Sequence, residues 1–467
     1  MPLIIPSNSI SGEFEVANSL RFNQASSDHL QRTNSTPTSD KKYTYSTWLK
    51  RSDLGDRQQF MRVINPSSTS SYAFIEFQSD DKIGTNDYNL SDSYSVITNR
   101  VFRDVSAWYH IVLSVDTTQG TSSNRVKLYV NGVQETSLSS SSYGSQNGSV
   151  IATSSGRNFY SGAGENTRFF GGYMAETVFI DGTALDPTSF GEFDEDSGIW
   201  KPIDVSGLTF GTNGFYLPFE NSGALGQDDS GNGNNFTVNN LTSIDQSTDT
   251  CTNNFATLNP LIPIGGTFSE GNLQHTRSSA GYRSAVSSIG VSSGKWYVEI
   301  KSPDSENIGV GVINGDNSSG LYMSGSEQFL GQHSYDVGYY FNGVLYVGNS
   351  SQSGSWTSYT SNDIIGIAID VDNGFVYFSK NGTFVNSGDP TSGATGTGGY
   401  NLSGIGSNGT YFIGCSTGNN SEHYVNFGNS IFTISSGNSD GNGYGNMEFA
   451  VPSGYYVLNS KNLAEYG

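Results

Sequence analysis

The 467-residue sequence has only 2 cysteines and few basic side chains. Cys251 and Cys415 could form at most one disulfide, and because they lie far apart in differently composed regions, we expect both to be free thiols. Lys and Arg number 22 against 43 Asp and Glu, which gives a formal net charge of −21, and no basic cluster occurs. Since nucleic acids and anionic membranes are bound through basic side chains, the sequence predicts neither partner.

Long hydrophobic runs and targeting signals are also missing. No apolar run reaches the roughly 18 residues that a membrane-spanning helix needs. The N-terminal segment lacks a charged start and a long apolar core, so we do not expect it to be a signal peptide. Charged residues make up only 14% of the chain whereas aromatic residues make up 13%, and this balance favours an all-β fold because rings suit a pleated, half-buried surface.

Alternating hydrophobic patterns predict short strands in the first half. In residues 108–115, every second residue from 109 on is aromatic or aliphatic, so these side chains share one face of the predicted strand. His110 lies on the opposite face, and we expect it to have a packing role there. The alternating run 126–130 meets Asn131-Gly132, the strongest short hairpin signal. Asp186 before Pro187 predicts a single helical turn that begins at the proline and is capped by the aspartate.

The second half has the same character. Residues 296–301 alternate, and three hairpin signals follow at Asn342-Gly343, Asp372-Asn373-Gly374 and Asn381-Gly382. Strands spaced in this way indicate a sandwich. The sequence therefore predicts two antiparallel β-sandwiches of the concanavalin or jelly-roll type in tandem.

The boundaries follow from shifts in composition, with the main one near residue 260, where prolines bracket an extended segment. We predict an N-terminal arm at 1–20, a first sandwich at 21–203, a connecting segment at 204–265, a second sandwich at 266–430 and a C-terminal tail at 431–467.

The strand series carry a resemblance to known families. WYHIVLSVD, VKLYVNGVQ and FFGGYMAETVFIDGTAL in the first half resemble a laminin-G-like (LamG), concanavalin A-like domain. GKWYVEI, NIGVGV, YYFNGVLY, IIGIAIDVDNGFVYFSKNG and YVNFGN in the second half resemble a SPRY domain. Together with GFYLPFE, TNNFATLNP and PSGYYVLNSKNL, the arrangement resembles structural proteins of marine tailed bacteriophages that join these two domains.

The resemblance implies a non-enzymatic structural protein located in the virion, where it contacts other virion proteins. The leading expectation is a tail fibre or adhesin-type appendage that binds a host-surface glycan or protein, and that forms a homo-oligomer, a trimer if it is a fibre. Two alternatives stay open: a capsid decoration or head-fibre protein without a receptor role, and a polysaccharide-degrading enzyme on a concanavalin-like fold.

The sequence offers no convincing catalytic residues. Glucanases of the concanavalin-like class carry Glu-x-Asp-x-x-Glu on one strand, so that two carboxylates act on the same glycosidic bond. The nearest match, 192–197, has Ser197 in place of the second glutamate and follows a short helical turn, so we expect a solvated acidic loop. Gly-x-Ser-x-Gly occurs at 290–294 and 437–441, but no helix is expected to follow either match.

The sequence also shows no strong signal for a metal or cofactor site. The five histidines are scattered, and we predict no cofactor and no metal ligand. Calcium stays open, because Asp228, Ser230 and Asn232 resemble the start of an oxygen-ligand loop, although Asn239 stands where a glutamate would be needed. We expect Asp370 and its neighbour at 372 to be turn residues.

Glycan binding is the remaining chemistry. A sugar site needs an aromatic ring to stack on sugar C–H groups and polar groups to hold hydroxyls. Four rings in loop-like contexts are the candidates: Tyr322, Tyr335, Trp356 and Tyr359.

Overall fold

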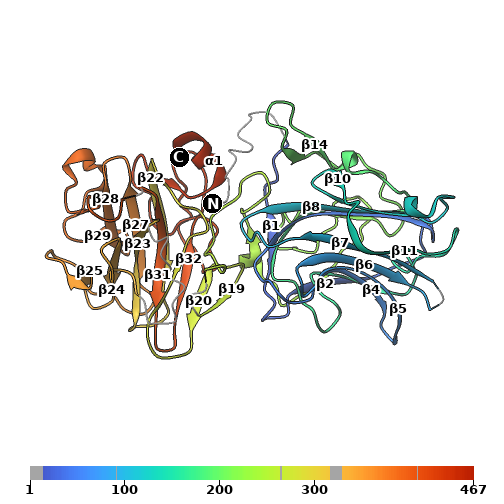
Figure 1. Ribbon diagram of the computed structural model, residues 1–467, viewed down its shortest axis with the longest axis horizontal. Coiled ribbons are helices and arrows are strands. Elements are labelled where there is room, and N and C mark those ends of the chain that lie inside the picture. The colour runs from blue at the N-terminus through green and yellow to red at the C-terminus, as the bar shows by residue number, and fades with distance from the viewer. Residues whose placement is uncertain (1–13, 91, 263–265, 316–328, 408) are drawn as a thin grey trace. The chain divides into compact units, whose positions relative to one another are not determined.

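The computed structural model describes residues 14–467 except 91, 263–265, 316–328 and 408, and it confirms the all-β prediction (Figure 1). The chain divides into two compact units between Thr252 and Asn253. We call the described residues up to 252 the first unit and those from 253 the second unit. Within the described residues every helix is short, and none has the length and apolar character needed to cross a bilayer.

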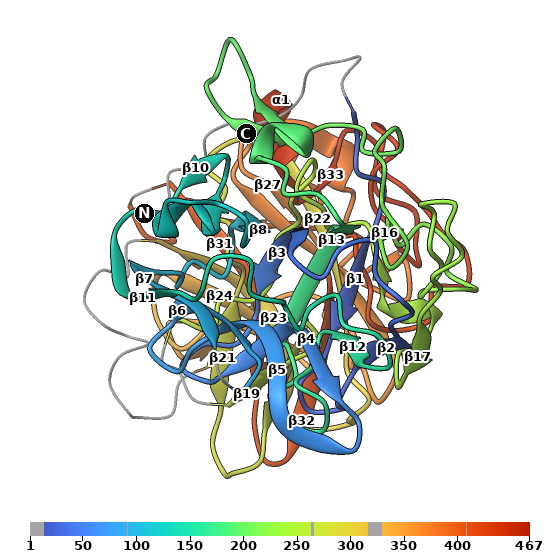
Figure 2. The same cartoon turned by 90° about the vertical axis from the view of Figure 1, so that its right-hand side faces the viewer.

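The first unit contains two antiparallel sheets. The sheet around β3, here called the β3 sheet, runs in the order β10, β9, β8, β3, β13, β1 and β18, with β16 paired to β13 (Figure 2). Its strands are β1 (Ser19–Phe22), β3 (Lys42–Arg51), β8 (Trp108–Asp116), β9 (Val126–Val130), β10 (Val133–Gln134), β13 (Gly172–Asp181), β16 (Phe215–Leu217) and β18 (Gln246–Ser247).

The other sheet of the first unit, here called the β5 sheet, runs in the order β11, β7, β6, β5, β4, β12, β2 and β17. Its strands are β2 (His29–Thr33), β4 (Gln58–Asn65), β5 (Ser68–Phe77), β6 (Lys82–Tyr88), β7 (Ser93–Val101), β11 (Leu138–Tyr143), β12 (Asn158–Ser161) and β17 (Thr237–Asn239). Figure 1 shows the two layers, with β1 and β8 above β6, β4 and β5. A small pair, β14 (Gly191–Phe193) and β15 (Trp200–Pro202), completes the unit.

The core of the first unit lies between the two sheets, where side chains such as Tyr45 and Leu113 meet Val63 and Ile75. The predicted alternation in β8 is confirmed, since its odd-numbered residues from 109 on enter this core. Every residue of β8 is nevertheless buried. The outer face of the β3 sheet is covered by a second hydrophobic cluster, in which Val112 packs with side chains from the segment that follows β13.

The predicted connecting segment 204–265 needs correction, because its residues up to Thr252 belong to the first unit. Three short strands in this segment, β16, β17 and β18, pair with β13, β2 and β1 respectively. The segment is rich in turn residues, but it also carries apolar side chains such as Phe210, Phe215 and Leu217, and their burial holds it on the sandwich. The predicted arm boundary at 20 likewise falls inside β1.

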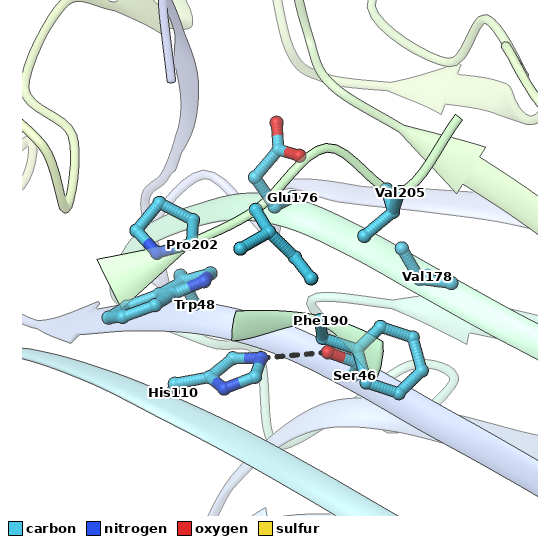
Figure 3. Close-up of a pocket in the computed structure, with 9 residues that line it drawn as sticks. Ser46, Trp48, His110, Glu176, Val178, Phe190, Pro202 and Val205 are labelled. Atoms are coloured by element: carbon cyan, nitrogen blue, oxygen red, sulfur yellow. Dashed lines mark hydrogen bonds between the residues drawn. The ribbon is translucent and has the colours of Figure 1, made fainter. Parts of the chain in front are cut away.

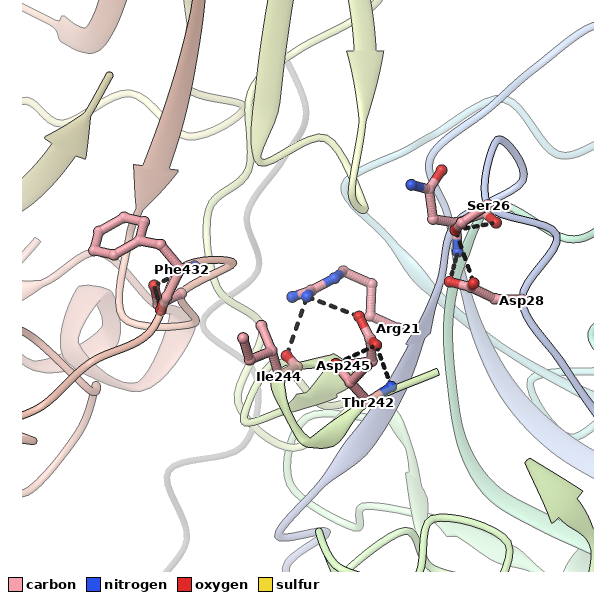
Figure 4. A network of polar contacts seen from close by, with 9 residues as sticks. Arg21, Ser26, Asp28, Thr242, Ile244, Asp245 and Phe432 are labelled. Carbon is pink, nitrogen blue, oxygen red and sulfur yellow. Dashed lines mark hydrogen bonds and ion pairs between the residues drawn. The ribbon is translucent and has the colours of Figure 1, made fainter. Parts of the chain in front are cut away.

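A buried ion pair fixes the end of this segment to β1 (Figure 4). Nη2 of Arg21 donates to Oδ1 of Asp245 at 3.1 Å and to the carbonyl of Ile244 at 3.0 Å. The other carboxylate oxygen of Asp245 accepts from the backbone N–H of Thr242 at 2.7 Å and so closes a capping box. Residues 242–245 are therefore part of the folded unit, not of a free linker.

Three local predictions are confirmed. Pro187–Ser189 forms a 3₁₀ helix, and the side chain of Asp186 accepts from the backbone N–H of Thr188. Both cysteines are free. At the hairpin signal, Asn131 and Gly132 take φ values of 47° and 77°, as the tight turn requires.

We predict that Gly132→Ala destabilises the first unit more than Gly55→Ala does. Both glycines have φ near +80°, but a Cβ at Gly132 would lie 2.3 Å from the Trp200 ring, whereas one at Gly55 would meet no atom within 4 Å. Both variants carry the left-handed penalty of about 1–2 kcal/mol, and only Gly132→Ala adds overpacking of about 1–3 kcal/mol. Urea unfolding measures the difference, and equal losses would contradict the packing of Trp200 on this turn.

The second unit also contains two sheets. The sheet around β22 runs in the order β19, β20, β32, β22, β27, β28 and β29, with β30 paired to β28 and β33 to β22. Its strands are β19 (Thr267–Ser269), β20 (Gln274–Arg277), β22 (Lys295–Lys301), β27 (Ile364–Asp370), β28 (Phe375–Lys380), β29 (Thr383–Phe384), β30 (Tyr400–Asn401), β32 (Ser421–Asn426) and β33 (Tyr456–Val457).

The opposing sheet of the second unit runs in the order β21, β31, β23, β24, β25 and β26. Its strands are β21 (Arg283–Val286), β23 (Ile308–Asn314), β24 (Asp336–Tyr340), β25 (Val344–Val347), β26 (Ser350–Ser351) and β31 (Tyr411–Thr417). The predicted hairpins at 372–374 and 381–382 join β27 to β28 and β28 to β29. The core between the sheets includes Trp296, Val310 and Ile367.

The predicted tail 431–467 is part of the second unit and not a separate segment. β33 adds a parallel pair to β22, and α1 (Ser460–Tyr466) follows it, capped by the side chain of Asn459. Val457 and Leu458 are fully buried. Their burial explains why the chain returns to the sandwich after a stretch dominated by glycine, serine and asparagine.

Candidate functional site

The solvent-facing side of the β5 sheet carries a row of large side chains at its centre. Strand pairing places Tyr160 opposite Arg62, Arg62 opposite Phe74 and Phe74 opposite Asn86. The neighbour of Arg62 in sequence, Val63, lies in the core. Because side chains alternate across a strand, the whole row points away from the core.

A second row lies beside the first. Tyr72 pairs with Tyr88, and the two rings are 5.6 Å apart between centroids. Tyr72 also stacks on Phe74, with centroids 5.8 Å apart and planes 19° apart. All three rings are half-buried. We call Arg62, Tyr72, Phe74 and Tyr88 the ring face.

Small polar side chains surround the ring face. Cross-strand pairing extends the two rows of side chains over the neighbouring strands, where the polar residues are Gln31, Asn86, Ser95 and Asn158. Their amides and hydroxyls can donate and accept hydrogen bonds beside a flat aromatic surface. Rings that stack on sugar C–H groups, with polar groups that hold hydroxyls, are what a glycan-binding surface requires.

Sequence reasoning missed the ring face, although part of the signal was present. In β5, Tyr72 and Phe74 alternate with Ala73, Ile75 and Phe77, so two rings on the face opposite the core could have been read from the pattern. The contribution of Arg62 depends on how β4 and β5 pair, with register shifts that the sequence does not display.

Of the four predicted glycan-binding rings, one is not described by the structure and one is buried. Tyr322 lies outside the described residues. Tyr359 is only 4% exposed and packs in the core of the second unit, where its hydroxyl donates to the carbonyl of Tyr339 at 3.0 Å. This prediction for Tyr359 needs correction, because a ring buried in the core has no face for a sugar.

The other two rings are half-buried and belong to different clusters. Trp356 packs against Tyr339 and Phe378, with centroids 6.1 and 6.3 Å away. Tyr335 stacks on His333, with centroids 5.3 Å apart and planes 8° apart. The structure therefore does not bring Trp356 and Tyr335 together into one site, and glycan binding by either ring stays a prediction.

A pocket on the outer face of the β3 sheet holds the one histidine that the sequence placed within a strand pattern (Figure 3). His110 stacks on Trp48, with centroids 4.7 Å apart. Nε1–H of Trp200 donates to Nδ1 of the imidazole at 2.9 Å, and the remaining nitrogen lies 2.8 Å from the hydroxyl of Ser46. Both ring nitrogens are thus used, and the predicted packing role is confirmed.

A carboxylate lines the same pocket. Burial raises the pKa of Glu176 to about 7, and Oε2 accepts from the hydroxyl of Tyr216 at 2.7 Å. Figure 3 shows this carboxylate pointing away from His110, so the two groups do not form an acid–base pair. The space between the lining side chains is too narrow for a water molecule, and hence for a substrate.

We predict that His110 stays neutral in the folded protein well below pH 6. Burial lowers its pKa from 6.5 to about 3, and protonation of Nδ1 would break the bond from Trp200. Between these two values the unfolded chain binds a proton that the folded chain does not, so this group lowers stability as pH falls, by up to about 1.4 kcal/mol per pH unit. Imidazole nitrogen shifts followed by NMR test this, and a midpoint near 6.5 would contradict it.

In the acidic stretch 192–197, the first two residues belong to β14, so the prediction of a loop holds only from Asp194 on, where the chain turns toward β15. The backbone N–H and hydroxyl of Ser197 both donate to Asp194 at 2.8 Å. These bonds, with help from Lys201, lower the pKa of Asp194 to about 2. Its carboxylate therefore stays ionised and shapes the loop.

The other acidic candidates also hold turns. Oδ1 of Asp228 accepts from the backbone N–H groups of Tyr216 and Ser230, both at 2.9 Å, so this loop is shaped by hydrogen bonds, and calcium stays an untested alternative. Asp370 accepts from Asn373 across the β27–β28 turn, as predicted. In the described part of the chain, no three His, Cys, Asp or Glu side chains lie close enough together to hold a metal ion.

Comparisons with known proteins agree with both domain predictions. Residues 24–188 match the family described as the concanavalin A-like lectin/glucanases superfamily, and residues 294–430 match the SPRY domain. A search of the curated proteins found no match.

A search of the solved structures found similar chains. The SPRY domain of human HERC1 is 18% identical, with 33% of this chain and 87% of that chain covered and a TM-score of 0.25. The native heptameric SAP-like pentraxin from Limulus polyphemus is 14% identical, with 37% and 79% covered and a TM-score of 0.29. The TRIM65 PSpry domain is 10% identical, with 37% and 88% covered and a TM-score of 0.28.

Proposed function

We propose that this protein is a non-enzymatic component of a bacteriophage virion, an adhesin-type appendage that binds a glycan on the host surface. The observation that carries the glycan part is the ring face, where Tyr72, Phe74 and Tyr88 form a half-exposed aromatic surface at the centre of a rigid sheet. A platform on a sheet loses little conformational freedom on binding, because its side chains are already held in place.

Two further observations support a binding role over catalysis. The acidic groups that the sequence singled out, such as Asp194, Asp228 and Asp370, each hold a turn through hydrogen bonds. The pocket that contains His110 has no room for a substrate. Assignment to a virion, contact with other virion proteins and assembly as a homo-oligomer, a trimer if it is a fibre, rest on the sequence resemblance described above.

Glycan-array binding of the full chain tests the proposal, alongside antibody labelling of virions. We expect binding to a subset of glycans, no release of reducing sugars, and labelling at an exposed appendage. Labelling of the capsid without binding to any glycan would indicate a decoration protein. Polysaccharide cleavage that a single carboxylate substitution abolishes would indicate an enzyme.

A further inference from the structure

Arg62 places a positive charge at the centre of the ring face. Its guanidinium carbon lies 4.8 Å from the centroid of the Tyr72 ring and 5.8 Å from that of Phe74. At these distances the rings attract the cation and hold it in place. The charge is thus fixed beside the surface on which a sugar would stack.

Most N–H groups of the Arg62 guanidinium make no hydrogen bond within the described residues. A guanidinium carries five N–H groups, and the hydrogen bond of Arg62 to a protein group is a long one, from Nη1 to Oε1 of Gln59 at 3.5 Å. Its Nε is buried, so the donors that remain for a ligand are those of the terminal nitrogens, and Nη2 has no hydrogen-bond partner within the described residues. Within the same residues Arg62 makes no ion pair. A half-buried arginine without a carboxylate partner is poised to bind an external anion.

The charges named around Arg62 balance, so that Arg62 itself gives its region one excess positive charge, although the whole chain has a net charge of −21. Arg57 and Arg168 both pair with the fully buried Glu76, so that carboxylate is already neutralised. Glu165 is the other carboxylate that acts on Arg62. Three arginines therefore stand against two glutamates in this region.

We propose that the glycan bound at the ring face is anionic, with a carboxylate or sulfate group that pairs with Arg62 while adjacent sugar rings stack on Tyr72 and Tyr88. This inference rests on the proposed glycan-binding function and names its ligand class. A planar guanidinium matches the paired oxygens of either group.

The test measures binding of the full chain to alginate, heparin and dextran oligosaccharides, which supply carboxylates, sulfates and no charge respectively. We expect the wild type to prefer alginate or heparin, and the stronger of the two identifies the anion. Arg62→Gln should weaken that binding about tenfold or more and leave dextran binding within about twofold. Raising salt from about 50 to about 500 mM should weaken the wild type more than the variant.

Arg103→Gln is the matched control, because it removes the same charge from an exposed side chain that pairs with Asp81 elsewhere on the first unit. It should leave all binding unchanged. If Arg62→Gln does not fold, Arg62→Lys keeps the charge without the planar fork and should still weaken binding of the anionic oligosaccharides.

The outcomes separate this inference from the proposed function. A preference for dextran, an unchanged affinity of a folded Arg62 variant, or an equal loss in Arg103→Gln would overturn the anionic assignment. If the double variant Tyr72→Ala/Tyr88→Ala loses glycan binding in any of these three cases, the proposal that the ring face binds glycans is retained. If no oligosaccharide binds, or if neither the arginine nor the tyrosine variants change binding, both proposals fail.

Discussion

Asp249→Ala should lower the free energy of unfolding of the first unit by about 3–5 kcal/mol, the range expected when one partner of a buried ion pair is removed. Oδ2 of Asp249 lies 2.7 Å from Nζ of Lys50, and neither side chain is more than 1% exposed. Oδ1 accepts from the indole N–H of Trp108 at 3.2 Å. Without the carboxylate, the buried Lys50 ammonium loses the negative charge that lies 2.7 Å from it.

Urea unfolding of the full chain, followed by tryptophan fluorescence, measures this loss. The tryptophans that report on the first unit are Trp48, Trp108 and Trp200. Asp229→Ala is the control, because that side chain is exposed, and it should change stability by no more than about 0.5 kcal/mol. The double variant Lys50→Met/Asp249→Leu should recover much of the loss, since a well-packed apolar pair often replaces a buried ion pair without cost. If Asp249→Ala unfolds like the control, Asp249 is not held against Lys50 and Trp108.

Tyr72→Ala/Tyr88→Ala should abolish most glycan binding. Two aromatic contacts at about 1–1.5 kcal/mol each correspond to a roughly 30- to 150-fold weaker affinity. Both side chains point away from the core, so the free energy of unfolding should change far less than for a core substitution. Titration calorimetry with the oligosaccharide that binds best measures the change.

Phe193→Ala is the matched control for this prediction. Phe193 is 49% exposed and also belongs to the first unit, but it lies on β14 and not on the β5 sheet. Its removal should leave glycan affinity unchanged. Equal losses from both changes would mean that exposed rings bind without specificity, and no loss from the tyrosine variant would exclude the ring face as the binding surface.

The parts of the fold that follow from local patterns were predictable from the sequence. The alternation in β8 and the Asn131-Gly132 turn depend on residues that are neighbours in the chain, and the structure confirms both. The same is true of the helical turn after Asp186. Each of these features needs only a period of two or a single positive φ.

The parts that depend on distant contacts were not predictable. β16, β17 and β18 are only two or three residues long and sit in turn-rich sequence, so nothing local marks them as strands of the first unit. The ring face forms because β5 lies between β4 and β6, in registers that the sequence does not display, and this pairing brings Arg62 and Tyr88 beside Phe74 and Tyr72. Loop rings such as Tyr359 looked exposed because the surrounding residues are polar, yet the ring fills the core.

The central claim is that the solvent-facing side of the β5 sheet binds glycans. A crystal structure of the full chain with its best-binding oligosaccharide tests this most directly. The account predicts sugar rings against Tyr72 and Tyr88, with an anionic substituent at the guanidinium of Arg62. A sugar bound instead at Trp356 or Tyr335, with the ring face empty, would contradict it.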